Sequence, residues 1–223
     1  DGERVPMPGK LYYRGISVED IVTAHQQNGT FGYEEVAYLL LLGKLPTRAQ
    51  LQRFNDVMAQ ARRMPAAFTE DMILKAPSRD VMNKLARSTL ALYSYDPDPE
   101  NKALEAEMLK AVQLIARYPV IVAHAFACKR HYYDNESLYL HRPQEGLSVA
   151  ENFLYSVRHD NQFTQDEARL LDLCLVLHME HGGGNNSTFT TRVVTSSGSD
   201  TYSVIAAALS SLKGPKHGGA NIK

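Results

Sequence analysis

The sequence predicts an all-α fold, and three kinds of observation support this. Three segments have the capping-box pattern that opens helices, in which a hydroxyl residue is followed three positions later by Gln or Glu. Apolar residues recur at helical spacing between Val81 and Leu92. No alternating strand pattern competes after residue 15. We therefore expect many helices of ordinary length, joined by short links, with no internal domain boundary. The capping boxes are Thr47–Gln50, Ser148–Glu151 and Thr164–Glu167.

The first residues predict little regular structure. Residues 1–10 contain two prolines and two glycines, which favours an extended arm. Polar and aromatic residues alternate from Lys10 to Arg14, which predicts a short strand or hairpin. Ser17 is followed by acidic residues, so we expect its hydroxyl to cap a helix that stops at Asn28-Gly29.

Two further helices are expected before residue 65. Residues 33–42 are nearly all apolar in their second half, and Gly43 and Pro46 follow them. The capping box at Thr47 then opens a helix that we expect to reach about Arg63.

The middle of the chain predicts two long helices. The first spans Ser78 to Tyr93 and is ended by Asp96-Pro97-Asp98-Pro99, because proline removes a donor and restricts the residue before it. The second spans Leu104 to Cys128 and contains Pro119, which predicts either a kink near Arg117 or two abutting helices. Residues 131–147 are expected to be irregular.

The last part of the chain predicts three helices. Two start at capping boxes and are expected to reach about Arg158 and His178. The third is the apolar run from Tyr202 to Leu212. Residues 196–200 lack the lysine of a phosphate-binding P-loop, so we interpret them as a loop whose Ser199 or Asp200 caps this last helix.

Composition excludes several classes of protein. The 223 residues are 44% hydrophobic with a formal charge of −1, which is ordinary for a soluble globular protein and argues against a nucleic-acid partner. No run of eighteen apolar residues and no secretion signal is present, so we expect no membrane span and a cytoplasmic location. Cys128 and Cys174 lie in apolar helical patterns, which favours buried reduced thiols over a disulfide.

Two glycine-rich segments that contain histidine bracket the last helix. They are residues 181–186 (HGGGNN) and residues 213–221 (KGPKHGGAN). Glycine lets a backbone approach a ligand closely but weakens a helix, so two such segments joined by a stiff spacer indicate a preorganised site.

Three ordered motifs around these histidines resemble the citrate synthase family. They read HMEHGGGNNST (178–188), SSGSDTYS (196–203) and LKGPKHGGAN (212–221), and His181 and His217 are 36 positions apart. The resemblance continues upstream in YYRGI (12–16), EEVAYLLLLGKLP (34–46) and AENFL (150–154). It therefore covers nearly the whole chain and includes the near relative 2-methylcitrate synthase.

The resemblance implies a reaction and its site residues. The family takes a proton from the methyl group of acetyl-CoA, adds the enol carbon to the ketone of oxaloacetate, and hydrolyses the thioester. No cofactor stays bound, and acetyl-CoA or propionyl-CoA acts as a co-substrate. The catalytic residue is His217, which would donate a hydrogen bond to the thioester carbonyl as the enol forms. His181 and Asn185 would bind oxaloacetate, and the backbone amides of Gly218, Gly219 and Ala220 would hold the acyl-CoA.

Several of these residues have other interpretations. His178 and His181 lie three apart and could bind a metal, but no third ligand is evident, so we expect no metal and interpret His178 as a supporting or core histidine. Ser187 and Ser203 lack an evident activating arrangement for a nucleophile. Lys213 and Lys216 could attract coenzyme phosphates or simply be solvated, and the sequence does not separate these two roles.

The resemblance also predicts what residues 1–223 do not contain. The family needs a further histidine, an aspartate base and substrate-binding arginines, which all lie downstream of the HGGAN motif. We therefore expect residues 1–223 to be an incomplete large helical domain, without the small domain and inactive by itself. The alternatives are a 2-methylcitrate synthase, or a helical dimerisation module without catalysis. The family forms homodimers, and the most apolar helices are the candidates for the interface, namely Ser78–Tyr93, Leu104–Cys128 and Tyr202–Leu212.

Overall fold

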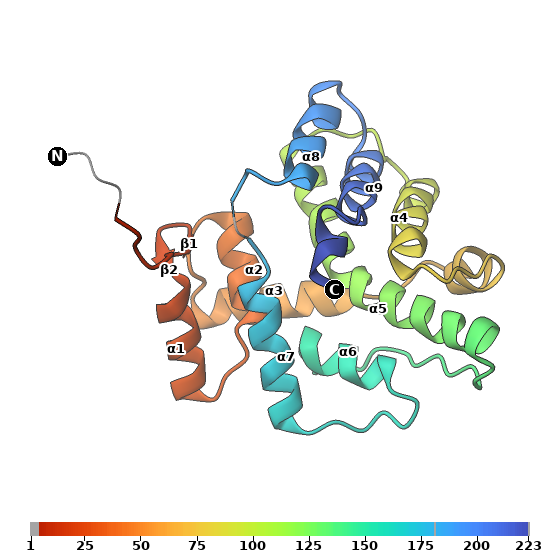
Figure 1. Cartoon of the computed structure of the whole chain (residues 1–223), viewed down its shortest axis with the longest axis horizontal. Helices are drawn as coiled ribbons and strands as arrows, with labels where there is room; N and C mark the ends of the chain where they lie inside the picture. Colours follow the sequence, from red (N-terminus) through yellow and green to blue (C-terminus); the bar gives the residue numbers. More distant parts are fainter. Residues whose placement is uncertain (1–4, 181, 223) are drawn as a thin grey trace.

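A computed structural model describes residues 5–180 and 182–222 of the chain, and helices dominate it (Figure 1). Its only sheet among these residues is a two-stranded hairpin near the N-terminus. The prediction of an all-α fold is therefore confirmed.

The hairpin joins β1 (Tyr12–Tyr13) to β2 (Ile16–Ser17), as the alternation around residues 10–14 predicts. Arg14 and Gly15 both have positive φ at the turn, which suits the right-handed twist of paired strands. Helix α1 (Val18–Asn28) follows directly. Ser17 occupies the N-cap position, but the predicted cap by its hydroxyl is wrong, because the side chain makes no cap bond. The amide of Val18, the first helical residue, donates to Leu11 O of the hairpin at 3.0 Å. The predicted stop is confirmed by Gly29, whose φ is 62°.

Helices α2 (Tyr33–Leu42) and α3 (Arg48–Ala61) lie where the sequence predicts them. The α2 helix ends at Gly43 with φ 80°. The α3 helix starts at a complete capping box, in which the side chains of Thr47 and Gln50 each accept a bond from the other residue's backbone amide.

Helix α4 (Val81–Leu92) starts slightly later than predicted, because the Asp80 carboxylate accepts a bond from the Asn83 amide and fixes the first turn there. Two short elements flank it that the sequence did not predict. They are the π-helix η1 (Thr69–Leu74) and the 3-10 turn η2 (Tyr93–Tyr95).

Helix α5 (Leu104–Asp134) is a single helix of 31 residues with Pro119 inside it, so two abutting helices are ruled out. Figure 1 shows that α5 first runs behind α8 and α9 and then turns outward, as expected for a proline kink. The predicted end at Cys128 is wrong. The helix continues to Asp134 and stops at Asn135, whose φ of 57° is a left-handed cap.

Five helical elements follow the long loop in the described residues. They are α6 (Val149–Val157), α7 (Gln165–Leu177), α9 (Thr201–Leu212) and the 3-10 turn η3 (Gly218–Ile222), with α8 (Asn186–Ser196) before α9. Helix α8 was not predicted, because its threonines and valines disfavour a helix.

The core is built around α5, which packs against α3, α4, α6 and η1. Ala116, Ile121 and Ala123 of α5 are fully buried. By length and hydropathy α5 could cross a membrane, but half of its apolar stretch is buried, as in a core helix of a globular protein. Cys128 is a buried free thiol as predicted, whereas Cys174 is free but exposed, because it faces outward on α7.

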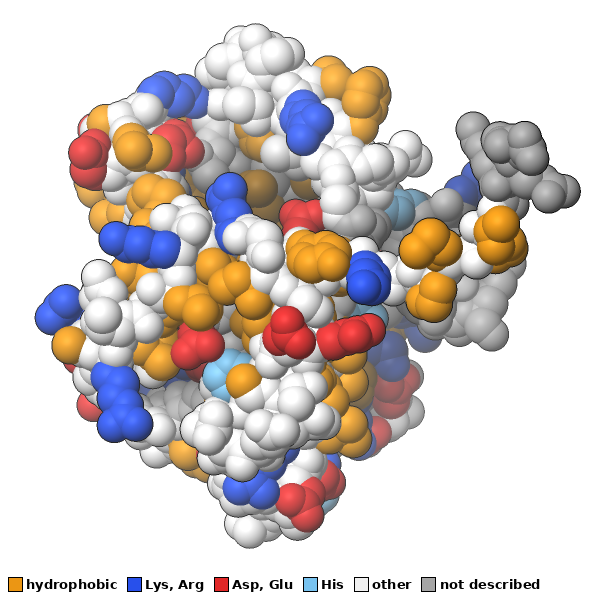
Figure 2. Space-filling view, turned by 90° about the vertical axis from the view of Figure 1, so that its left-hand side faces the viewer, with side chains coloured by type: hydrophobic (Ala, Val, Ile, Leu, Met, Phe, Trp, Pro, Cys, Tyr) orange, Lys and Arg blue, Asp and Glu red, His pale blue; other side chains and the backbone are white. Residues whose placement is uncertain are grey.

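The surface mixes apolar and charged side chains. On the face that Figure 2 shows, hydrophobic side chains lie between Lys, Arg, Asp and Glu side chains. Exposed Leu42 and Leu45 belong to the end of α2 and the loop after it. Scattered apolar residues of this kind are usual on globular proteins.

Candidate active site

Two packed helices bring the two glycine-rich segments together. Helix α8 starts at the first segment, and α9 ends at the second and packs along α8 (Figure 1). Each helix begins at a side-chain cap. Asn185 Oδ1 accepts from the Thr188 amide at 2.9 Å, and Asp200 Oδ1 accepts from the Ser203 amide at 2.9 Å, which confirms the predicted cap of α9.

His217 contacts Ser187 of α8. The half-buried His217 ring has its Nε2 at 3.0 Å from Ser187 Oγ, and its backbone amide donates to Gly214 O at 2.9 Å. Ser187 Oγ in turn donates to Asn185 Oδ1 at 2.7 Å. The structure thus joins His217 and Asn185, two predicted site residues, through a serine.

The bond from Ser187 to Asn185 indicates which ring nitrogen of His217 carries a proton in this arrangement. A serine hydroxyl has one proton, and Asn185 Oδ1 is an acceptor only, so this proton goes to Asn185. The bond between Ser187 and the ring therefore needs an N–H at His217 Nε2. His217 is a hydrogen-bond donor in this arrangement.

The same direction argues against Ser187 as a nucleophile. General-base activation requires the hydroxyl proton to point at an unprotonated ring nitrogen. Here the ring donates and the hydroxyl proton points away. Ser187 thus contacts His217, a residue 30 positions away, without the arrangement that would activate its hydroxyl.

The glycines after His217 are needed for close packing. A Cβ at Gly218 would lie 2.5 Å from Leu212 O, and a Cβ at Gly219 would lie 3.1 Å from Gly214 O. Within the loop, the amide of Gly219 donates to Gly214 O at 3.2 Å and that of Ala220 to His217 O at 3.0 Å. These internal bonds shape the loop itself.

His181 lies outside the described residues, but its neighbours are well anchored. The Tyr13 hydroxyl, which is fully buried, donates to Val176 O at 2.8 Å and accepts from the Glu180 amide at 3.4 Å. Burial raises the pKa of Tyr13, so the hydroxyl stays protonated at neutral pH. The hairpin therefore holds the segment that leads to His181.

His178 is a helix cap and not a core residue. It is exposed at the end of α7, and its Nδ1 donates to Cys174 O at 2.7 Å. No group of three His, Cys, Asp or Glu side chains with metal-binding geometry occurs in residues 5–180 and 182–222.

Arg192 lies beside the first glycine-rich segment, and the sequence did not mark it. Its side chain extends from α8 over the first glycine-rich segment, where a Cβ at Gly183 would lie 3.1 Å from Arg192 Nη2. The signal in the sequence was faint, because an arginine in an unpredicted helix has no motif of its own.

Lys213 and Lys216 behave differently. Lys213 Nζ pairs with Asp80 Oδ2 at 3.1 Å and ties the end of α9 to the start of α4. Burial raises the pKa of Asp80, but the bond from Asn83 and the Lys213 ammonium outweigh it and keep the carboxyl below its usual range. Lys216 is exposed. Of the two lysines, Lys213 has a structural partner that the sequence did not reveal.

Comparison with known proteins gives consistent relatives. The family model described as "Citrate synthase, C-terminal domain" matches residues 1–223. The chain is 35% identical to 2-methylcitrate synthase 1 of Corynebacterium glutamicum, over 97% of the chain and 55% of the relative. It is also 35% identical to the citrate synthase of Synechocystis sp., over 96% of the chain and 50% of the relative. The chain thus spans about half the length of these curated relatives.

Solved structures agree with these relatives. The citrate synthase of Pyrobaculum aerophilum is similar with a TM-score of 0.82 at 35% identity, over 96% of the chain and 52% of that structure. A ternary complex of carboxymethyl coenzyme A and oxaloacetate with the citrate synthase of Thermoplasma acidophilum has a TM-score of 0.79 at 30% identity, over 95% and 52%. On the match across its whole length, the chain belongs to the citrate synthase family.

Proposed function

We propose that the whole protein condenses acetyl-CoA with oxaloacetate and releases citrate and CoA. A base removes a proton from the acetyl methyl group, the new carbanion attacks the ketone carbon, and water then cleaves the thioester. The observation that carries this proposal is the contact of His217 Nε2 with Ser187 Oγ at 3.0 Å, in a segment that the family model matches. Relatives of both the citrate synthase and 2-methylcitrate synthase kinds support a condensing enzyme that uses acyl-CoA.

His217 would stabilise the enolate that forms from the acetyl group. Negative charge develops on the thioester oxygen, and a fixed N–H donor stabilises it without reorganising at the moment of reaction. In the structure this donor is directed at Ser187. The substrate oxygen can replace Ser187 at Nε2. Alternatively, Ser187 can turn its proton from Asn185 to Nε2, so that Nδ1 becomes the donor.

The oxaloacetate side of the site would lie at the first glycine-rich segment. His181 and Asn185 remain the proposed contacts. We add Arg192, because its guanidinium lies over Gly183 and a guanidinium pairs well with a carboxylate. Gly218, Gly219 and Ala220 remain the proposed contacts of the acyl-CoA.

The general base is proposed to come from outside residues 1–223. The side-chain contact of His217 among the described residues is a hydroxyl and not a carboxylate. Removal of one member of a group of residues that act together loses most of the rate, so residues 1–223 alone should release no thiol from acetyl-CoA. The whole protein should do so, in the cytoplasm and as a homodimer.

The homodimer proposal has some support from exposed side chains. Leu90 of α4 and Leu104 and Leu109 of α5 are more than half exposed, although they lie in the helices that the sequence marked as interface candidates. Analytical ultracentrifugation of the whole protein tests this. A monomer at assay concentrations would contradict the proposal.

The test of activity follows thiol release from acetyl-CoA and oxaloacetate. Whole protein, residues 1–223 and the whole protein with His217→Gln are compared, with propionyl-CoA in a parallel series. Thiol release that needs both substrates and is lost in His217→Gln supports the proposal. Its absence in the whole protein overturns it and favours a helical dimerisation module without catalysis. A preference for propionyl-CoA assigns a 2-methylcitrate synthase, since the two differ by one methyl group in the pocket.

Ser187→Ala separates the two arrangements of the donor. If the substrate replaces Ser187 at Nε2, the variant keeps its kcat or gains, because a competitor is gone. If Ser187 must supply a proton to Nε2, kcat falls while the KM for oxaloacetate stays the same.

A further inference from the structure

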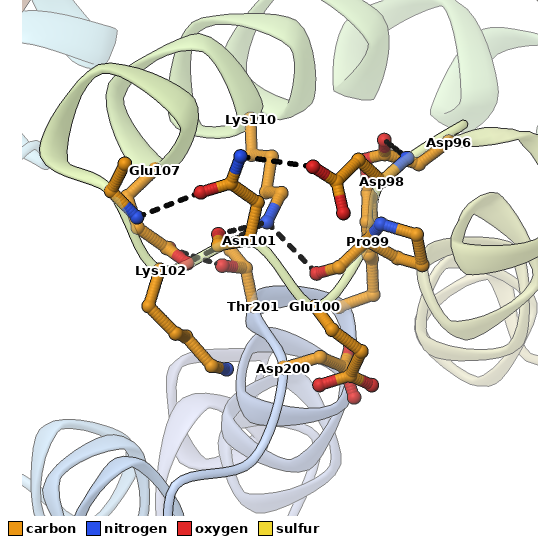
Figure 3. Close-up of polar contacts among 12 residues, drawn as sticks. Asp96, Asp98, Pro99, Glu100, Asn101, Lys102, Glu107, Lys110, Asp200 and Thr201 are labelled. Atoms are coloured by element: carbon orange, nitrogen blue, oxygen red, sulfur yellow. Dashed lines mark hydrogen bonds and ion pairs between the residues drawn. The ribbon is translucent and has the colours of Figure 1, made fainter.

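A buried lysine of α5 lies near the start of α9, the helix whose other end leads to His217. Lys110 of α5 is only 3% exposed, and no sequence motif marks it. Its Nζ donates to Pro99 O at 2.8 Å and to Asn101 O at 2.7 Å, and Glu107 Oε1 lies 3.6 Å away (Figure 3). Two protons of the ammonium group are thus directed at carbonyl oxygens, and Glu107 Oε1 is an ion-pair partner beyond hydrogen-bond distance. Lys110 acts as an internal cation around which the loop before α5 folds.

The loop is locked from within as well. The Asp98 amide donates to Asp96 Oδ1 at 2.9 Å, and Asn101 Nδ2 donates to Asp98 Oδ2 at 2.9 Å. The Ala103 amide donates to Asn101 Oδ1 at 2.9 Å. Figure 3 shows these residues gathered around the Lys110 side chain.

Three bonds connect this locked loop and α5 to the start of α9. The Tyr202 hydroxyl donates to Asp96 Oδ2 at 2.7 Å, and Lys102 Nζ donates to Ser199 O at 2.6 Å. The Thr201 hydroxyl donates to Glu107 Oε2, the carboxylate whose other oxygen faces Lys110. Glu107 itself faces Lys110. Asp96 and Lys102 lie close in sequence to Pro99 and Asn101, whose carbonyl oxygens Lys110 bonds. The ammonium is therefore the common support of all three.

Helix α9 transmits this support to the active site. It has 12 residues, which is about 18 Å of rigid helix, and His217 follows five residues after its last residue. At that end the ion pair between Lys213 and Asp80 holds the helix against α4. The position of α9 along α8 sets the 3.0 Å separation of His217 Nε2 and Ser187 Oγ.

We propose that Lys110 is a positioning residue for His217, acting through the loop of residues 96–103 and the rigid helix α9. It touches no substrate. The effect on the reaction rests on the function proposed above, whereas the effect on the His217 ring does not depend on it.

The chain offers a matched control. Lys84 of α4 is also buried, at 1% exposed, and its Nζ also holds two carbonyl oxygens, donating to Met72 O at 3.0 Å and to Ala76 O. These carbonyls belong to η1 and the loop after it, whereas those that Lys110 bonds belong to the loop that contacts the start of α9. Lys110→Met and Lys84→Met therefore remove the same kind of bond at different places.

The test reads the His217 ring directly in the whole protein. Its ¹⁵N signals are assigned by their loss in His217→Gln, and spectra are compared well below the unfolding temperature. Lys110→Met should shift the His217 ring signals and remove the hydrogen-bonded Nε2 proton, while Lys84→Met should leave both unchanged. In the condensation assay Lys110→Met should lower kcat by about 100-fold, the loss expected from a misplacement of about 1 Å, with the KM for oxaloacetate unchanged.

Every outcome decides the proposal. Unchanged ring signals in Lys110→Met overturn it and leave Lys110 a purely stabilising residue. Equal shifts in both lysine variants also overturn it, because general loosening then explains them. Shifted signals in a protein without condensation activity support the positioning role and reject the proposed function. If Lys110→Met does not fold, the milder double variant Thr201→Val with Tyr202→Phe cuts two of the three links, and the ring signals must shift there.

Discussion

Replacement of Gly218 by alanine should damage both stability and the active site. The new Cβ would lie 2.5 Å from Leu212 O, 2.8 Å from Leu212 Cδ1 and 3.1 Å from Leu212 Cγ. The leucine side chain can rotate away, but its carbonyl oxygen belongs to the last turn of α9 and cannot. The separation must grow from 2.5 Å to at least 3.0 Å, so the loop has to move away from the helix.

The size of the effect follows from this clash. Inserting one carbon into a packed site typically costs about 1–3 kcal/mol. For a chain of this size each kcal/mol lowers the melting temperature by about 2–4 °C. We therefore expect Gly218→Ala to melt about 2–12 °C below the wild type. Because His217 is the preceding residue, its bond to Ser187 should lengthen and kcat should fall.

Thermal unfolding followed by far-ultraviolet circular dichroism measures this, with Gly184→Ala as the control. Nothing lies within 4 Å of a Cβ at Gly184, so the control should match the wild type or gain about 0.4–1 kcal/mol from a stiffer unfolded chain. A Gly218→Ala protein that melts with the wild type and keeps its kcat would refute the close approach of loop and helix.

Three further variants test the anchoring of the site and the surface pairs. Tyr13→Phe should cost about 0.5–1.5 kcal/mol, because it removes the bond to the buried carbonyl of Val176; chemical denaturation measures this. Glu167→Gln should destabilise the chain only where the carboxylate is charged. Arg158 and the capping bonds lower the pKa of Glu167 from 4.5 to about 2, so its contribution is complete above 4.5 and disappears as the pH falls through 2. Arg192→Gln should raise the KM for oxaloacetate about 10- to 100-fold, the loss of a charged hydrogen bond.

For each of these variants, one outcome would contradict the prediction. A Tyr13→Phe protein as stable as the wild type would mean that the hairpin does not anchor the end of α7. For Glu167→Gln, a stability difference that persists at pH 2 would exclude the charge as its origin. For Arg192, the KM for oxaloacetate should recover partly in Arg192→Lys. An unchanged KM in Arg192→Gln would remove this arginine from the site.

Local signals in the sequence located most helices, because capping and helix termination depend on neighbouring residues. The capping boxes at Thr47, Ser148 and Thr164 are all formed as predicted. The failures occurred where distant contacts decide. Ser17 has the right neighbours for a cap, but it is paired in the hairpin and its hydroxyl makes no cap bond. Helix α8 forms against the propensity of its residues because it packs along α9.

The candidate site divides in the same way. His217, Asn185 and the glycines follow from ordered motifs, whereas Ser187 and Lys110 act through partners that no local pattern reveals. The serine is two residues from Asn185 in sequence, yet its role depends on a helix that the sequence did not predict and on a histidine 30 positions away. Once Asn185 takes its only proton, the serine can hold the ring only as an acceptor. This single constraint turns a residue that could have been a nucleophile into one that fixes the donor proton of His217. Ser187→Ala therefore tests the direction of the bond, which spacing in a sequence cannot specify.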